Sequence, residues 1–305
     1  MDEPLSRYAK VGIIHFMLWP ATGKGEGPIV ETIERLAADT YFDAIEVTRI
    51  ADDEIRHQVR EMLITARVTV AFGAQPILLG DGLDLNAADE TERSRAIDAV
   101  KKGIDQAYSL EAVGCAVLSG TDPGPANRKQ AADLLVDSLK WLSDYTAQKG
   151  EIPIVLETFD RVPFGKNCLI GPSEEAADIA RRVRKDFPSF GLMLDLSHLP
   201  LLEETPHQAV SAMGDYLVHA HMGNCVMHDA GHEAYGDNHP RFGVPAGEND
   251  VPELTDYLRE LKAAGFLDKA RRPILSFEVK PLTGESVEAL LAGSKRALAE
   301  AWAAV

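Results

Sequence analysis

The feature that most limits the fold of this chain is a repeated alternation of short apolar segments with longer amphipathic ones. The apolar segments are mostly continuous and rich in β-branched residues, a pattern typical of parallel strands that are covered on both faces. We predict strands at 10–17, 43–48, 68–75, 115–119, 152–158, 190–196, 216–222 and 273–279, and helices at 28–39, 52–66, 89–112, 126–149, 173–187, 204–214, 250–264 and 284–304.

Eight strand–helix rounds within 305 residues predict a single (β/α)8 TIM barrel that spans residues 1–305. A doubly wound sheet is the alternative, but six strands would suit that fold better than eight. The segment LWPATGKGEG at 18–27 follows the first predicted strand, and its glycines do not match the dinucleotide-binding fingerprint. No linker or low-complexity segment divides the chain, so the barrel is the favoured fold.

Four of the predicted strands end in a side chain that can bind a metal or transfer a proton. These side chains are Glu157, Asp195, His221 and Glu278. The carboxyl ends of parallel barrel strands meet at one rim, so we expect the four groups to face a single point. Carboxylates together with an imidazole suit a hard or borderline divalent cation, and no thiol accompanies them as a structural zinc site would require. The sequence therefore predicts a metal site formed by these four residues.

The overall charge and the cysteine content exclude several classes of protein. The formal net charge is −17, which disfavours a nucleic-acid partner because an acidic surface repels phosphate backbones. Three irregularly spaced cysteines argue against a disulfide framework. No apolar run is long enough to span a membrane, and the N-terminal segment MDEPLSRYAK lacks the apolar core of a signal peptide. We expect a cytoplasmic protein without a nucleic-acid or membrane partner; a homo-oligomer remains open.

Several motifs around these strand ends resemble the xylose isomerase-like TIM-barrel superfamily, which includes keto-sugar 3-epimerases, inosose isomerases and dehydratases, and family-2 apurinic endonucleases. The resemblance covers roughly residues 10–300. It rests on LETFD, on the D-x-x-H of Asp195 and His198, on VHAHMGN, on the Arg-x-Gly-x-x-x-Gly-Glu run that begins at Arg241, and on SFEV.

The resemblance implies that Glu157, Asp195, His221 and Glu278 bind Mn²⁺ most readily, with Mg²⁺, Co²⁺ or Zn²⁺ as alternatives. It implies an isomerase or epimerase of a ketose or keto-polyol that works through a metal-stabilised enediolate. Glu157 and Glu278 would then be the catalytic pair, one removing the proton next to the carbonyl and the other returning it. His198 and Arg241 would contact substrate oxygens.

Other activities on the same fold stay open. An enediolate can also expel a substituent, which would make the protein a dehydratase or a lyase acting on 3-keto-glycosides. An apurinic endonuclease would need histidines after the third and fourth strands, where the chain has GAQP and LSG instead. The Asp237-Asn238-His239 element resembles that branch, however, and with His198 it predicts a second metal site as an alternative. A non-catalytic barrel would have lost one of the four ligands, and none is lost.

A few further residues are candidates for the substrate pocket. His15 ends the first predicted strand and either lines the pocket or packs against a neighbouring strand, while Lys280 either neutralises an anionic substrate group or pairs with Glu278. Glu46 points into the barrel in one register or forms a buried pair with an arginine such as Arg49. Two long predicted loops, 76–88 and 223–249, follow strands and should lie at the same rim.

Overall fold

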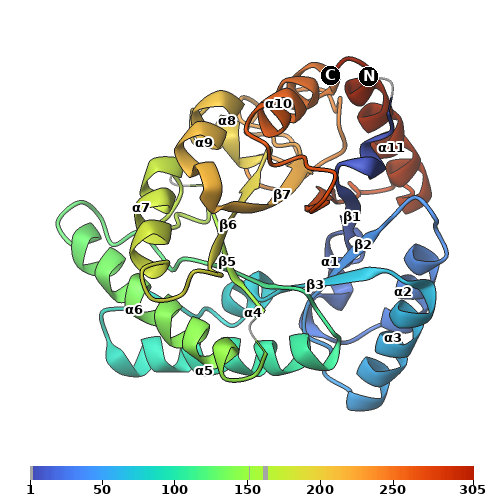
Figure 1. The fold of residues 1–305 in the computed structure, drawn as a ribbon. Coiled ribbons are helices and arrows are strands. Elements are labelled where there is room, and N and C mark those ends of the chain that lie inside the picture. The colour runs from blue at the N-terminus through green and yellow to red at the C-terminus, as the bar shows by residue number, and fades with distance from the viewer. Residues whose placement is uncertain (1–2, 151, 161–163) are drawn as a thin grey trace.

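The eight strands close into one parallel barrel in chain order, with helices packed around its outside (Figure 1). The structure is a computed structural model and describes residues 3–150, 152–160 and 164–305. The strands are β1 (Lys10–Ile14), β2 (Ala44–Val47), β3 (Thr69–Gly73), β4 (Cys115–Leu118), β5 (Ile154–Glu157), β6 (Gly191–Asp195), β7 (Leu217–Gly223) and β8 (Ile274–Glu278).

Pairing between the first and last strands completes the ring. Lys10 of β1 is in register with Ile274 of β8, and the two strands stay paired as far as Ile13 and Phe277. Every neighbouring pair is parallel, so all eight carboxyl ends lie at one rim. The predicted (β/α)8 barrel is confirmed, and each strand lies within or close to its predicted range.

The helices follow the predicted order, with short additional turns before or after several strands. The helices are α1 (His15–Leu18), α2 (Ile29–Ala37), α3 (Asp53–Ala66), α4 (Gln75–Gly80), α5 (Glu90–Ser109), α6 (Arg128–Ala147), α7 (Ser173–Val183), α8 (His198–Leu201), α9 (Pro206–Met213), α10 (Val251–Ala263) and α11 (Val287–Ala303), with 3₁₀ turns η1 (Leu5–Arg7), η2 (Pro20–Lys24) and η3 (Gly214–Tyr216).

One predicted loop contains a helix. The segment 76–88 was expected to be irregular, but α4 begins at Gln75 and continues to Gly80. Pro76 occupies the first turn of this helix, where its missing N–H costs no hydrogen bond. This helix places Gln75 at the rim of the barrel.

Apolar stripes on the outer helices form the main core against the strands. In α2, Ile29, Ile33 and Leu36 are almost completely buried, as expected for positions that share one face of a helix. The helix α3 begins after Asp52, whose carboxylate accepts hydrogen bonds from the N–H groups of Glu54 and Ile55. None of the helices in the described part of the chain combines the length and apolar character needed to cross a bilayer.

Candidate metal centre at the mouth of the barrel

The four predicted ligands come together at the carboxyl ends of four consecutive strands. Glu157, Asp195 and Glu278 are the last residues of β5, β6 and β8, and His221 lies near the end of β7. One ligand atom from each lies within 4.8 Å of the other three. All four side chains are buried. The structure therefore brings together the residues that the sequence predicted would meet.

The geometry of this cluster fits a bound cation better than a hydrogen-bonded network. His221 Nδ1 lies 2.8 Å from Glu278 Oε2 and 3.3 Å from Glu157 Oε1. Nevertheless, none of these three buried atoms makes a hydrogen bond within the described structure. Two ligands bound at right angles to an ion at 2.0–2.1 Å lie about 3 Å apart. Three lone-pair atoms at that spacing form a donor set that a divalent cation would satisfy.

Neighbouring groups hold two of the carboxylates in place. Gln75 Nε2 donates a hydrogen bond of 2.7 Å to Glu157 Oε2, which leaves Oε1 facing His221. The backbone N–H of Ser197 donates to Asp195 Oδ1 at 2.9 Å, and the Ser197 hydroxyl donates to Oδ2. Such partners orient ligands and tune their affinity for metal. Gln75 is not among the residues predicted for the site, although its place in GAQP at a strand end was the available signal.

The charge of the cluster raises the proton affinity of His221. Burial alone would lower the pKa of this imidazole, but the carboxylates of Glu46, Glu157 and Glu278 outweigh burial and raise its pKa well above the usual value. A proton or a cation can satisfy the same concentration of negative charge. The electrostatics therefore also favour a positive species at this point.

A second buried cluster adjoins the first one. Asp237 Oδ1 lies 3.1 Å from His198 Nε2 and 3.0 Å from His239 Nε2, and it joins the three residues of the predicted alternative site. His198 Nδ1 donates to the carbonyl of Thr158 at 2.6 Å. The ammonium group of Lys166 pairs with the other oxygen of Asp237. His239 Nε2 also lies 3.1 Å from Glu278 Oε1, so the two clusters share an edge.

Charge in the second cluster also favours a protonated ring. Burial lowers the pKa of His198, but Asp237 and Asp195 outweigh burial and raise it to about 10. The Asp237 carboxylate is thus neutralised by groups of the chain itself, the His198 imidazolium and the Lys166 ammonium.

A cavity of about 280 Å³ opens above the predicted ligands. Glu157, His221 and Glu278 lie at its floor, and Lys280 lines it. Apolar side chains from the segments after β1 and β3 form another part of the wall. They are Ile14, Phe16, Met17, Pro20, Pro76 and Leu79. The cavity therefore combines a polar floor with an apolar wall, as small-molecule sites commonly do.

Two predicted substrate contacts do not line this cavity. His198 is completely buried among Thr158 and Asp237, and it lies in the second cluster. Arg241 instead donates from Nε to Glu285 at 3.0 Å and lines a groove between α10 and α11. The guanidinium group therefore lies beside the Glu285 carboxylate, just before the start of α11. This placement gives no support to a direct contact between Arg241 and a substrate in the cavity.

His15 also lies outside the cavity lining. The strand β1 ends at Ile14 and α1 begins at His15, so the strand alternation on which the prediction rested no longer applies. The ring is buried, and Nε2 lies 2.7 Å from the hydroxyl of Thr32. That hydroxyl donates to the carbonyl of Pro28, so His15 Nε2 is the donor toward Thr32. The ring is packed rather than exposed to the pocket, but its partner is Thr32 of α2 and not a residue of a neighbouring strand.

We expect His15 to make the protein less stable in mild acid. Burial lowers its pKa from 6.5 to about 4, so the unfolded chain binds this proton more readily than the folded chain does. Above pH 6.5 the ring is neutral in both states and does not affect stability. As the pH drops from 6.5 toward 4, the free energy of unfolding falls by about 3 kcal/mol in all. Urea unfolding at several pH values should show this loss in the parent but not in His15→Gln. The difference between the two curves cancels the titration of all shared groups, and parallel curves would contradict the expectation.

Comparisons with known proteins agree with this architecture. Residues 34–294 match the family model described as xylose isomerase-like TIM barrel. An L-ribulose 3-epimerase from Methylomonas sp. (strain DH-1) is 30% identical over 198 residues, which make up 61% of this chain and 64% of that protein. The match thus spans less than two thirds of the relative's length.

Solved structures with the same fold include sugar epimerases and a nuclease-family protein. The D-psicose 3-epimerase from Clostridium cellulolyticum H10, solved with D-tagatose, has a TM-score of 0.67 at 19% identity and covers 97% of this chain and 96% of its own. An AP endonuclease, family 2, from Brucella melitensis has a TM-score of 0.69 at 20% identity, with coverage of 93% and 97%. Because the family model covers most of the described barrel, the chain belongs to the xylose isomerase-like TIM-barrel family.

Proposed function

We propose that this protein is a divalent-metal-dependent sugar epimerase or isomerase that acts on a ketose or keto-polyol. The observation that carries the proposal is the convergence of Glu157 Oε1, His221 Nδ1 and Glu278 Oε2 without hydrogen bonds among them, on the floor of an accessible cavity. The 30% identity to an L-ribulose 3-epimerase supports the same class of reaction.

In this proposal Glu157, Asp195, His221 and Glu278 hold the cation, with Mn²⁺ as the favoured ion. When bound, the cation would polarise a substrate carbonyl and acidify the adjacent C–H group. Glu157 and Glu278 both reach the cavity, so one carboxylate takes the proton from carbon and the other returns a proton to it. Gln75 keeps Glu157 oriented, and the apolar wall excludes water from the reacting carbon.

The dimensions and charges of the cavity limit the substrate. A volume of about 280 Å³ lies near the lower end of the range for ligand sites, which suits a single sugar or a small cyclic polyol. Lys280 lines the wall, and we propose that its ammonium group contacts substrate oxygens. Deeply buried His198 would act through the second cluster rather than by direct contact.

The second cluster is a candidate second cation site, made by His198, Asp237 and His239 beside Asp195. Asp237 already pairs with Lys166, so a second ion would have to displace this ammonium group. We therefore propose one tightly bound ion per chain. Elemental analysis of the purified protein gives the number of ions directly, and two tightly bound ions per chain would favour a dinuclear centre.

The proposed activity is tested by incubating the Mn²⁺-loaded protein in D₂O with ketoses, inososes and 3-keto-glycosides in parallel. We expect deuterium to enter one substrate at a single carbon next to the carbonyl, together with formation of its epimer or isomer. Loss of a substituent instead would identify the dehydratase or lyase alternative. Absence of exchange with every substrate class would contradict the proposal. A cytoplasmic location, the lack of a nucleic-acid partner and the oligomeric state stay predictions from the sequence.

A further inference from the structure

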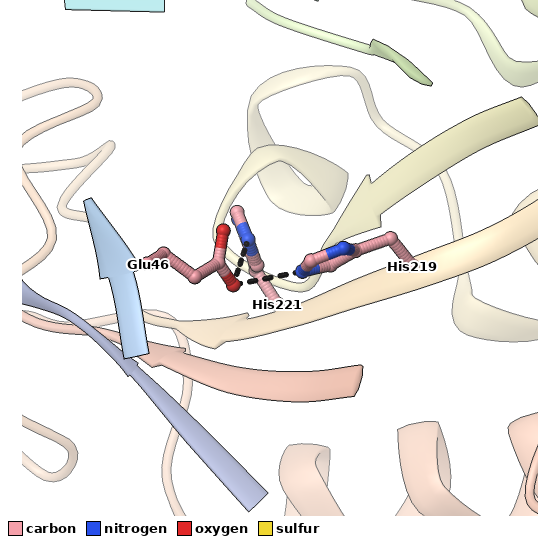
Figure 2. Close-up of side chains that lie close together, drawn as sticks. All are labelled: Glu46, His219 and His221. Atoms are coloured by element: carbon pink, nitrogen blue, oxygen red, sulfur yellow. Dashed lines mark hydrogen bonds and ion pairs between the residues drawn. The ribbon is translucent and has the colours of Figure 1, made fainter. Parts of the chain in front are cut away.

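A buried carboxylate three strands away in the ring is a hydrogen-bond partner of the proposed metal ligand His221. Glu46 of β2 reaches across the barrel interior toward β7, although these strands are not neighbours in the ring. Its Oε1 lies 2.7 Å from His219 Nε2 and 3.2 Å from His221 Nε2. Figure 2 shows both imidazole rings directed at this one oxygen. Of the two placements considered for Glu46, the structure shows the one inside the barrel, and Arg49 pairs with Asp81 instead.

The strand geometry explains why the two rings share one partner. His219 and His221 are two residues apart on β7, so both side chains point into the barrel, and His219 lies one layer deeper. All three side chains are more than nine-tenths buried. Glu46 lines both the cavity at the mouth and a second cavity of about 230 Å³, which lies at the amino-terminal ends of the strands and is also lined by His219. The contact between Glu46 and the two histidines thus separates the cavity at the mouth from the cavity at the amino-terminal ends of the strands.

The hydrogen bond to Glu46 determines which nitrogen of His221 is available to a metal. An ionised carboxylate only accepts hydrogen bonds, so His221 must carry its hydrogen on Nε2 to donate to Glu46. A neutral ring with hydrogen on Nε2 leaves a lone pair on Nδ1. This is the atom that faces Glu157 and Glu278, which are themselves acceptors. A hydrogen on Nε2 therefore presents Nδ1 to a cation.

We propose that Glu46 is a positioning residue that fixes the ring orientation and tautomer of His221, so that Nδ1 binds the catalytic cation. This role rests on the proposed function, because it presupposes the cation site. Hydrogen bonds already satisfy Glu46 Oε1 and the Nε2 atoms of both rings, whereas Glu157 Oε1, His221 Nδ1 and Glu278 Oε2 make none. We therefore assign no ion to these three residues. Their contact orients His221, a ligand of the proposed cation site.

The test compares Glu46→Gln with His219→Asn, using the Mn²⁺ dissociation constant measured by calorimetry and by electron paramagnetic resonance. Glu46→Gln keeps the shape of the side chain but removes the carboxylate, and we expect a 10- to 100-fold weaker affinity, the usual cost of losing a partner that orients a metal ligand. The number of bound ions should not change. His219→Asn removes the shorter of the two contacts and leaves His221 bonded to Glu46, so affinity should change less than about threefold.

The comparison separates positioning from a structural link. If Glu46 only tied β2 to β7, losing the shorter contact to His219 would weaken Mn²⁺ binding at least as much as Glu46→Gln does. Equal losses in the two variants, or an unchanged affinity in Glu46→Gln, would overturn the proposal.

A measurement on the unaltered protein keeps the proposal testable if Glu46→Gln fails to fold. Nitrogen NMR of the Mg²⁺-loaded parent should show hydrogen on Nε2 of His221 and none on Nδ1, and hydrogen on Nδ1 would contradict it. A parent that binds no divalent cation would remove both this proposal and the metal-dependent function. A parent that binds Mn²⁺ but exchanges no substrate hydrogen would remove only the proposed reaction.

Discussion

Replacing Glu157 or Glu278 with glutamine should abolish the exchange of a substrate C–H hydrogen with solvent deuterium. Glutamine keeps the size of the side chain but cannot take a proton from carbon. A positioned acid or base contributes about 10²- to 10⁴-fold to rate, so we expect exchange to fall at least about a hundredfold in each variant. Both residues are also proposed ligands, so exchange is measured by NMR at saturating Mn²⁺.

The control for this experiment is Glu285→Gln. Glu285 pairs with Arg241 and does not line the cavity at the mouth, so its loss changes the charge of the protein by the same amount without touching the site. We expect its exchange rate to stay within about twofold of the parent. Full exchange in both Glu157→Gln and Glu278→Gln at saturating Mn²⁺ would rule out the two-glutamate scheme.

Chelation of divalent cations should remove activity and lower the melting temperature. Without a cation, the buried atoms Glu157 Oε1, His221 Nδ1 and Glu278 Oε2 lie close together and make no hydrogen bonds. A ligand at 100 times its dissociation constant adds about 2.7 kcal/mol to the stability of the folded state. We expect readdition of Mn²⁺ to restore activity and to raise the melting temperature by several degrees in a calorimetric scan.

Two variants test whether the shift in melting temperature arises from a cation bound at the proposed site. Asp195→Asn removes a ligand charge and should abolish the shift caused by Mn²⁺. His228→Asn changes a histidine with a side chain that is 76% exposed, and it should retain the shift in full. A shift of equal size in Asp195→Asn and in the parent would place the cation elsewhere.

The sequence predicted the ring of strands and the four ligands because both depend on local patterns. Continuous apolar runs mark strands that are covered on both faces, and parallel closure brings their ends to one rim. Glu157, Asp195, His221 and Glu278 then needed no further information to be placed together. This part of the site follows from strand position alone.

The remaining side chains could not be placed because their directions depend on packing across the barrel or on irregular backbone. Strand alternation assigns Glu46 to the interior, but only the closed barrel shows that it meets two histidines of β7. His15 lies just beyond β1, where helical geometry turns it toward Thr32. Arg241 belongs to a long loop without periodicity, and Glu285 attracts its guanidinium group.

The two halves of the ring contribute different kinds of side chain to the mouth of the barrel. The proposed ligands come from β5 to β8, whereas most of the apolar wall comes from the end of β1 and the segments after β1 and β3, with Phe159 after β5 as a further apolar side chain. Selectivity among sugars and affinity for the ion should therefore be separable by engineering. A chimaera that takes residues 14–24 and 76–80 from a related enzyme, and keeps Gln75, could acquire the donor's preference for a sugar while keeping its own metal chemistry.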